Sequence, residues 1–193
     1  MNFVHPAIAA ALGLAFCGAA FAQAGTVQRD VNQQQRIEQG LQSGQLTTRE
    51  ASKLEREESR VERDQARAMQ DGKLSPAEKA RLAREQNRVS RDIYREKHDA
   101  QTGNPNSASS QRMQADVQRN INQQQRIEQG VKSGSLTNRE TARLERGEAR
   151  IDRKEARAGA NSKVNAAEQR RIQRAENRES RRIYKEKHDA QTK

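Results

Sequence analysis

Beyond its first 22 residues, the 193-residue chain has no cysteine, tryptophan or phenylalanine, and its only aromatic residues there are Tyr94 and Tyr184. Without thiols this part of the chain can form no disulfide, even in an oxidising compartment. Valine, isoleucine, leucine, methionine and tyrosine together make up roughly 15 % of it, a level at which disorder competes with folding. The composition therefore excludes a disulfide-stapled scaffold and predicts a thin hydrophobic core.

The residues needed for catalysis are also scarce. Apart from the first 22 residues the chain has two histidines, His98 and His188, and no glycine-rich phosphate loop. Its carboxylates alternate with arginine, a pattern that we interpret as solvated helix faces. The sequence therefore predicts a protein that is not an enzyme and that needs no cofactor.

The first 22 residues carry no lysine, arginine, aspartate or glutamate. The apolar run from Ala7 ends in Ala20-Phe21-Ala22, a small-x-small pattern typical of a cleavage site, so we interpret residues 1–22 as a signal peptide. A membrane anchor is the alternative, but the run is shorter than the roughly 20 residues that span a bilayer. Lipidation at Cys17 is disfavoured because Phe16 is large. We expect a periplasmic or secreted protein, cleaved near Ala22, without a membrane span in its mature form.

The rest of the chain is an internal duplication with a spacing of 90 residues. The segment 32–40 recurs letter for letter as 122–130, and 96–102 recurs as 186–192. Between the copies lies a run of small and turn-forming residues, Gly103-Asn-Pro-Asn-Ser-Ala-Ser-Ser110, typical of a flexible linker. This predicts one unit over 23–102, a linker over 103–112 and a second unit over 113–193, with units that move independently unless their faces dock.

Capping signals and apolar spacing predict an all-α fold. An N-cap residue followed three positions later by glutamate forms a capping box. The pairs are Thr47 and Glu50, Ser75 and Glu78, Thr137 and Glu140, and Asn165 and Glu168. Apolar residues at helical spacing predict three helices per unit, near 27–41, 47–70 and 75–99 in the first. Because Glu58 and Gln86 interrupt the apolar faces, we expect helical hairpins or loose three-helix bundles.

Two patterns raise the hypothesis of calcium or zinc binding. Gly44 and Glu50 are six residues apart, as are positions 6 and 12 of an EF-hand loop, so the turns resemble the second half of such loops. The earlier loop positions lack the carboxylates that calcium needs. His98 and His188 each precede an aspartate and could contribute to a shared metal site or a pH-sensitive contact. The alternatives are plain capped turns and cationic helix ends.

The net charge of +11 is unevenly distributed. Residues 27–102 contain 16 lysines and arginines against 14 acids, whereas residues 117–192 contain 19 against 11. The second unit is therefore a candidate for binding a polyanion such as lipopolysaccharide, anionic lipid or nucleic acid. A solvated arginine-rich face is the alternative. The candidate residues are Arg150, Arg153, Lys154, Arg157, Arg170, Arg171, Arg174, Arg178, Arg181 and Arg182.

The segments Leu46 to Glu50 and Leu136 to Glu140 resemble the Leu-Thr-x-x-Gln turns of the Spy and CpxP periplasmic stress proteins, with glutamate in place of glutamine. This resemblance implies a thin helical cradle that binds unfolded clients. The repeat as a whole is similar to those of secreted helical proteins of Gram-negative bacteria. Our leading hypothesis is an exported binding protein, chaperone-like toward unfolded or envelope proteins, with self-association as a further expectation.

Overall fold

The computed structural model describes residues 17–189, with side chains from Gln23 onward. This part of the chain forms six α-helices and no strand, which confirms the all-α prediction. The helices are α1 (Cys17–Ser43), α2 (Thr48–Ala68), α3 (Pro76–Lys97), α4 (Ala108–Ser133), α5 (Asn138–Ala158) and α6 (Ala166–Lys187), with a 3-10 turn at Gly159–Asn161 before α6. None of these helices combines the length and apolar character that a bilayer span requires.

The predicted signal peptide falls largely outside the described residues, as does the side chain of Cys17. The backbone of α1 begins at Cys17, so cleavage after Ala22 would fall within this helix. The helix is longer than the predicted segment 27–41. The added residues include Ala19, Ala20 and Ala22, and alanine has the highest intrinsic helix propensity.

Four helices begin at the predicted capping boxes. At the start of α2, the amide of Glu50 donates to Thr47 Oγ1 at 3.2 Å, and the amide of Thr47 donates to Glu50 Oε2 at 2.8 Å. Reciprocal bonds of the same kind begin α3, α5 and α6 at Ser75, Thr137 and Asn165. The boxes fix the helix starts, so α2 and α3 lie within two residues of their predicted bounds.

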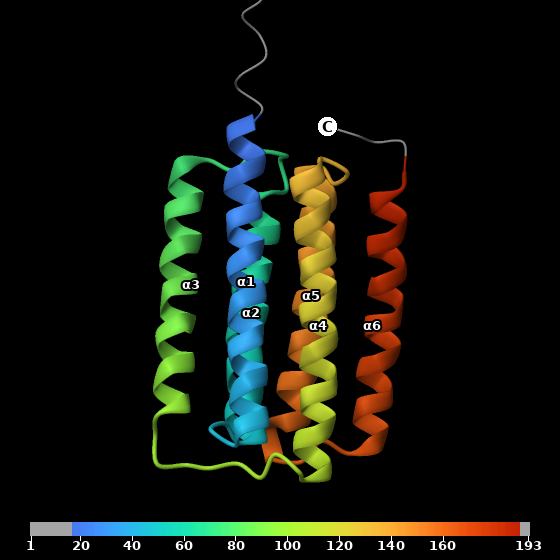
Figure 1. The fold of residues 1–193 in the computed structure, drawn as a ribbon. Helices are drawn as coiled ribbons and strands as arrows, with labels where there is room; N and C mark the ends of the chain where they lie inside the picture. Colours follow the sequence, from blue (N-terminus) through green and yellow to red (C-terminus); the bar gives the residue numbers. More distant parts are fainter. Residues whose placement is uncertain (1–16, 190–193) are drawn as a thin grey trace, which may run out of the picture.

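The six helices run up and down and form one bundle (Figure 1). Its centre consists of four helices, with α1 beside α4 and α2 beside α5, so each unit supplies two of them. The third helix of each unit lies outside this centre: α3 packs on α1 and α2, and α6 packs on α4 and α5. The two sequence repeats therefore adopt similar arrangements of three helices.

The two units share a core. One continuous apolar cluster includes Leu54 and Val61 of the first unit and Val117 and Ile151 of the second. The centre is also joined by a buried hydrogen bond from Ser59 Oγ on α2 to the carbonyl oxygen of Ala149 on α5, at 2.8 Å. Units that bury their apolar residues against each other cannot move independently, so the docked alternative holds.

The structure does not show the flexible linker predicted over 103–112. The amide of Gly103 donates to the carbonyl oxygen of Gly44 at 2.8 Å, which ties the segment to the loop between α1 and α2. A Cβ atom on Gly103 would lie only 2.4 Å from the carbonyl oxygen of Leu46. Helix α4 begins at Ala108 behind the N-cap Ser107, so half of the predicted linker is helical. The turn-forming residues therefore connect the two units in contact with the first unit, and they do not act as a flexible spacer.

Candidate functional site

The interior of the four central helices contains carboxylates. Nine acidic side chains there are each at most 1 % exposed: Asp30, Glu55, Glu58, Glu62, Asp116, Glu145, Glu148, Asp152 and Glu155. Among the described residues, no lysine or arginine forms an ion pair with any of them. The prediction that the carboxylates lie on solvated faces is therefore wrong for these nine.

Helical spacing explains why these side chains share one face. On α2, Glu55, Glu58, Glu62 and Gln65 follow one another at intervals of three, four and three residues, which places them on one side of the helix. The same spacing recurs 90 residues later on α5, where Glu145, Glu148, Asp152 and Glu155 occupy the matching positions. Because α2 packs against α5, the duplication brings both acidic rows into one interior.

Three of the carboxylates form a compact group. Glu55, Asp152 and Glu155 each offer an oxygen atom, and these atoms lie within 4.8 Å of one another. Amide side chains from the facing helices hold one oxygen of each carboxylate. Gln34 Nε2 donates to Glu55 Oε2 at 3.1 Å, and Asn120 Nδ2 donates to Glu155 Oε2 at 2.8 Å and to Asp152 Oδ1 at 3.3 Å.

The other oxygen of each carboxylate in this group receives no hydrogen bond from an amide, and neither do the amide oxygens of Gln34 and Asn120. When one partner is protonated, Glu55 can hydrogen-bond to Glu155, and Asp152 to Glu62. Five buried acceptor oxygens thus occur where no lysine or arginine of the described residues forms an ion pair. A buried acceptor that loses its hydration without gaining a partner is costly, and a buried charge is costlier still. The group is therefore arranged to accept protons or a positive ion.

The same pattern continues along the interior. Gln124 Nε2 donates to Glu62 Oε1 at 2.8 Å and to Glu145 Oε2 at 3.3 Å, so one amide bridges acids from both units. Glu58, Glu148 and Asp116 have no partner for either carboxylate oxygen. The amides of α1 and α4 orient part of this acidic interior but leave most of its charge uncompensated.

Burial raises the pKa of these carboxyl groups, because a charged carboxylate loses its hydration in the interior. The pKa of Asp30 and of Glu55 rises to about 7, and that of Asp116 to about 8. For Glu58, Glu62, Glu145, Glu148, Asp152 and Glu155, burial and then the neighbouring carboxylates raise the pKa well above its ordinary value. At neutral pH the interior is therefore partly protonated unless a cation replaces the protons.

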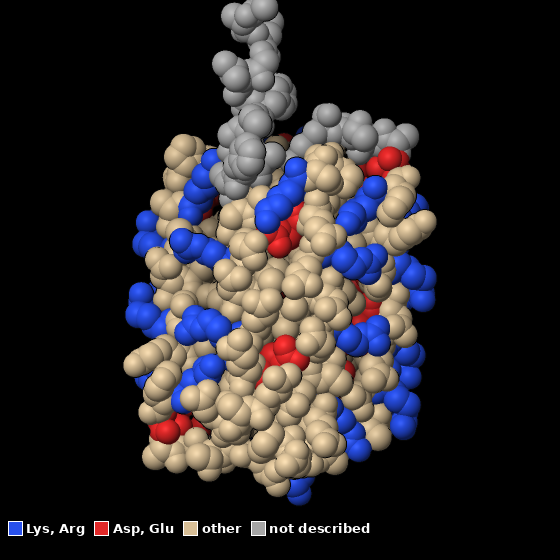
Figure 2. All heavy atoms as spheres, in the orientation of Figure 1, with Lys and Arg blue, Asp and Glu red and all other residues tan. Residues whose placement is uncertain are grey.

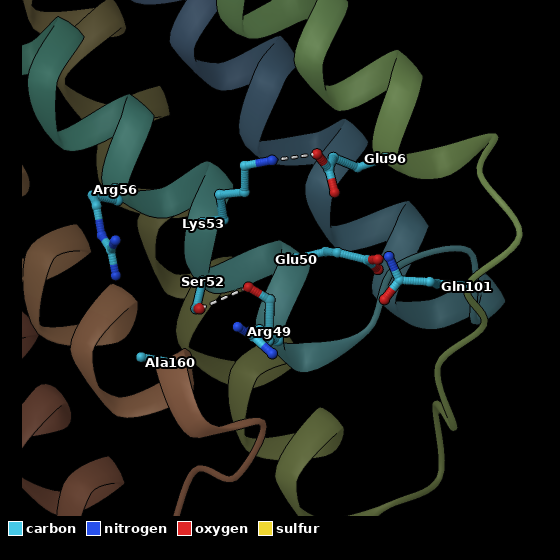
Figure 3. Close-up of a pocket in the computed structure, with 8 residues that line it drawn as sticks. All are labelled: Arg49, Glu50, Ser52, Lys53, Arg56, Glu96, Gln101 and Ala160. Carbon is cyan, nitrogen blue, oxygen red and sulfur yellow. Dashed lines mark hydrogen bonds and ion pairs between the residues drawn. The ribbon is translucent and has the colours of Figure 1, made fainter.

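A second kind of acidic cluster occurs once in each unit. Glu50, Glu96 and Asp99 converge where α2 begins and α3 ends, and Glu140, Glu186 and Asp189 form the matching cluster of the second unit. The first cluster adjoins a hollow of about 410 Å³, in which Lys53 Nζ binds Glu96 Oε1 at 2.6 Å (Figure 3). Because a cation already pairs with this cluster, it is a weaker metal candidate than the interior.

The two turns that resemble EF-hand loops serve as helix starts. Gly44 and Gly134 both have φ of +76°, which lets the chain turn back before α2 and α5. One oxygen of Glu50 and one of Glu140 are occupied by the capping boxes. Both glutamates also belong to the acidic clusters at the helix ends.

The structure does not bring the two histidines together with other ligand residues in the described part of the chain. His98 and His188 each cap the C-terminus of their helix, α3 and α6. Each Nδ1 lies 2.7 Å from the carbonyl oxygen of the tyrosine one turn earlier, and each ring stacks on that tyrosine. Each histidine therefore lies at a helix C-terminus, the position given to it in the alternative interpretation.

The ten cationic candidates of the second unit lie in three settings. Arg153 and Arg157 line a hollow with arginines of α2. Burial, followed by the charges of Arg178 and Arg150, lowers the pKa of Lys154, so these three cations lie close together. The remaining candidates, Arg170, Arg171, Arg174, Arg181 and Arg182, are exposed along α6. Figure 2 shows cationic side chains over the flanking helices and few over the centre of the face formed by α1 and α4.

Sequence reasoning missed the acidic interior and the contribution of α2 to the arginine hollow. The available signal was the position of Glu58 and Gln86 among apolar residues. Both are buried, at 1 % and 2 % exposure.

Comparison of the chain with protein-family models, with curated proteins and with solved structures gave no match.

Proposed function

We propose that this protein binds hard metal cations of the calcium class inside its four-helix centre, with Glu55, Asp152 and Glu155 as the principal ligands. The supporting observation is the convergence of three fully buried carboxylates, from both units, in a region without an ion-pairing lysine or arginine. A cation would replace the missing positive charge, so its binding and the stability of the fold are linked.

The geometry of the group suits an oxygen-coordinated ion. Calcium binds oxygen at about 2.3–2.6 Å, so two ligands on opposite sides of the ion lie about 4.8 Å apart. The oxygens of the group lie within that distance of one another. The unpartnered amide oxygens of Gln34 and Asn120 are neutral ligands of the kind that calcium also accepts. Zinc prefers histidine and cysteine, which this group lacks.

Protons are the competing occupants. Because the pKa of Glu55 rises to about 7, cation binding near neutral pH would displace protons from the group. Proton release on adding calcium therefore separates binding at the interior carboxylates from weak attraction to exposed acids, which are already ionised at that pH.

The test is calorimetric titration of the purified chain with calcium and with terbium, a luminescent ion of similar size. Glu155→Gln keeps the side-chain shape and removes one ligand charge, and we expect it to weaken binding about tenfold or more. The matched control is Glu85→Gln, since Glu85 lies outside the interior in an exposed pair with Arg81. Absence of binding by the unmodified chain, or equal weakening in both variants, would refute the proposal.

Export is part of the proposal and rests on residues 1–22. Cation sites of extracellular modules commonly have Kd values of about 10⁻⁴–10⁻³ M, so a low affinity would suffice there.

The chaperone-like role stays a prediction to be tested by suppression of client aggregation. The geometry favours it less, because the exposed large apolar side chains in the described part are Tyr94 and Tyr184.

A further inference from the structure

A hollow of about 310 Å³ lies between α2 and α5, and five arginines line it. Arg56, Arg60 and Arg63 come from the first unit, and Arg153 and Arg157 come from the second. Arg63 and Arg153 are equivalent positions of the duplication, 90 residues apart. The hollow therefore exists only because the two units dock, and neither unit alone contains it.

The close approach of the two helices forms the floor of the hollow. Its remaining lining residues are Ser59 and Ala156, both small and buried. The hydrogen bond from Ser59 Oγ to the carbonyl oxygen of Ala149 holds α2 against α5 at this level. Because the side chains between the two helices are small, the longer arginine side chains surround a shallow hollow.

Positive charge predominates in the hollow, although Asp64 and Glu57 lie near enough to influence Arg63 and Arg60. Its lining contains no carboxylate, and none of its five arginines forms an ion pair among the described residues. Arg63 Nε donates to the carbonyl oxygen of Ser59 at 2.9 Å, which fixes the direction of its guanidinium group. Burial and the charge of Arg153 lower the pKa of Arg63, as expected where like charges are held together.

We propose that this hollow binds a ligand with several linked or clustered phosphate groups. Guanidinium groups donate two parallel hydrogen bonds to a phosphate, and five of them around one hollow exceed what a single phosphate can neutralise. A free polyphosphate chain and the clustered headgroups of a phosphate-bearing lipid surface share this chemistry. The site differs from the predicted one, which lay in the second unit alone.

The test compares two double variants of the full chain that remove the same charge. Arg63→Gln with Arg153→Gln changes the hollow, whereas Arg170→Gln with Arg171→Gln changes exposed residues of α6. Tripolyphosphate binding is measured by calorimetry with chelator present, which keeps the interior cation site out of the experiment. Sedimentation with phosphatidic acid vesicles, against phosphatidylcholine vesicles, tests the lipid source. Circular dichroism checks that both variants fold.

We expect at least one phosphate source to bind, with an affinity that falls steeply as salt is raised. The Arg63 and Arg153 variant should lose about tenfold or more in affinity, and the α6 control should lose less than about twofold. Failure of both sources to bind, or equal losses in the two variants, would overturn the proposal. Because chelator removes metal ions throughout this experiment, neither result bears on the proposed cation site, which the calcium titration tests separately.

Discussion

Glu58 on α2 and Glu148 on α5 are equivalent positions of the duplication, and both are buried in the same interior with no hydrogen-bond partner for either carboxylate oxygen. Each also experiences the charge of Asp152, which raises its pKa further. Docking two copies of one acidic helix face therefore concentrates charge that each copy alone could leave in water. The fold depends on what neutralises that charge.

Stability should decrease as the pH rises. The pKa values of Asp30 and Glu55 rise from 3.8 and 4.5 to about 7 on folding. Between about pH 4 and pH 7 the folded chain therefore binds more protons than the unfolded chain, and the free energy of unfolding falls as these protons are lost. With chelator present, we expect Tm near pH 5 to exceed Tm near pH 8 by more than about 5 °C. Scanning calorimetry measures this, and a Tm that rises with pH would contradict it.

Removing the two unpartnered charges should stabilise the metal-free protein. At about pH 8, we expect Glu58→Gln with Glu148→Gln to raise the free energy of unfolding by about 1–3 kcal/mol. Each buried glutamate must there either carry a charge without a partner or take up a proton, and glutamine does neither. Near pH 4.5 the gain should shrink, because burial raises the pKa of both glutamates and their protonation there costs little free energy. Urea denaturation at both pH values measures the change. Glu85→Gln, which alters an exposed ion pair, serves as the control.

The crossing between the units should tolerate no side chain at Gly103. A Cβ atom there would collide with backbone atoms of Leu46 and Thr47, so Gly103→Ala should cost about 1–3 kcal/mol in urea denaturation. The matched control is Gly25→Ala in α1, where an added Cβ has nothing within 4 Å. The control should be neutral or slightly stabilising because alanine favours helix. An unchanged Gly103→Ala variant would support the flexible linker that we first predicted.

A single unit should not persist as a folded monomer. Residues 23–102 alone would expose Leu54 and Val61 where α4 and α5 cover the core. We expect this fragment either to unfold or to form a homodimer in which a second copy replaces residues 113–193. Sedimentation and circular dichroism distinguish the two cases. A helical monomer with a cooperative transition would show that the units are independent.

The two units carry one carboxylate on different helices. The first unit has Glu57 on α2 and Val89 on α3, whereas the second has Gly147 on α5 and Glu179 on α6. A Cβ on Gly147 would lie 2.1 Å from the Glu179 carboxyl group, so the two positions compete for one space. Gly147→Glu should therefore destabilise, and adding Glu179→Val should recover at least about 1 kcal/mol. Purely additive effects in urea denaturation would contradict this coupling.

The sequence was sufficient for the local structure. Capping boxes act within four residues, so Thr47 with Glu50 and Ser75 with Glu78 could be assigned to helix starts before any packing was known. The duplication likewise required only comparison of the chain with itself. These signals predicted the helices, their repeat and most of their bounds.

Only the tertiary structure decided which faces of the helices became interior. Glu55 adjoins Leu54 and Arg56 in sequence, and helical spacing alone permits it to lie either beside the core or in water. Packing of α2 against α5 and of α1 against α4 selects the first outcome, because the second unit covers the face that a lone unit would leave solvated. The same packing brings Arg63 and Arg153 to one hollow. The sequence by itself thus determined the elements, and the docking of the two units, which depends on contacts 90 residues apart, determined both candidate sites.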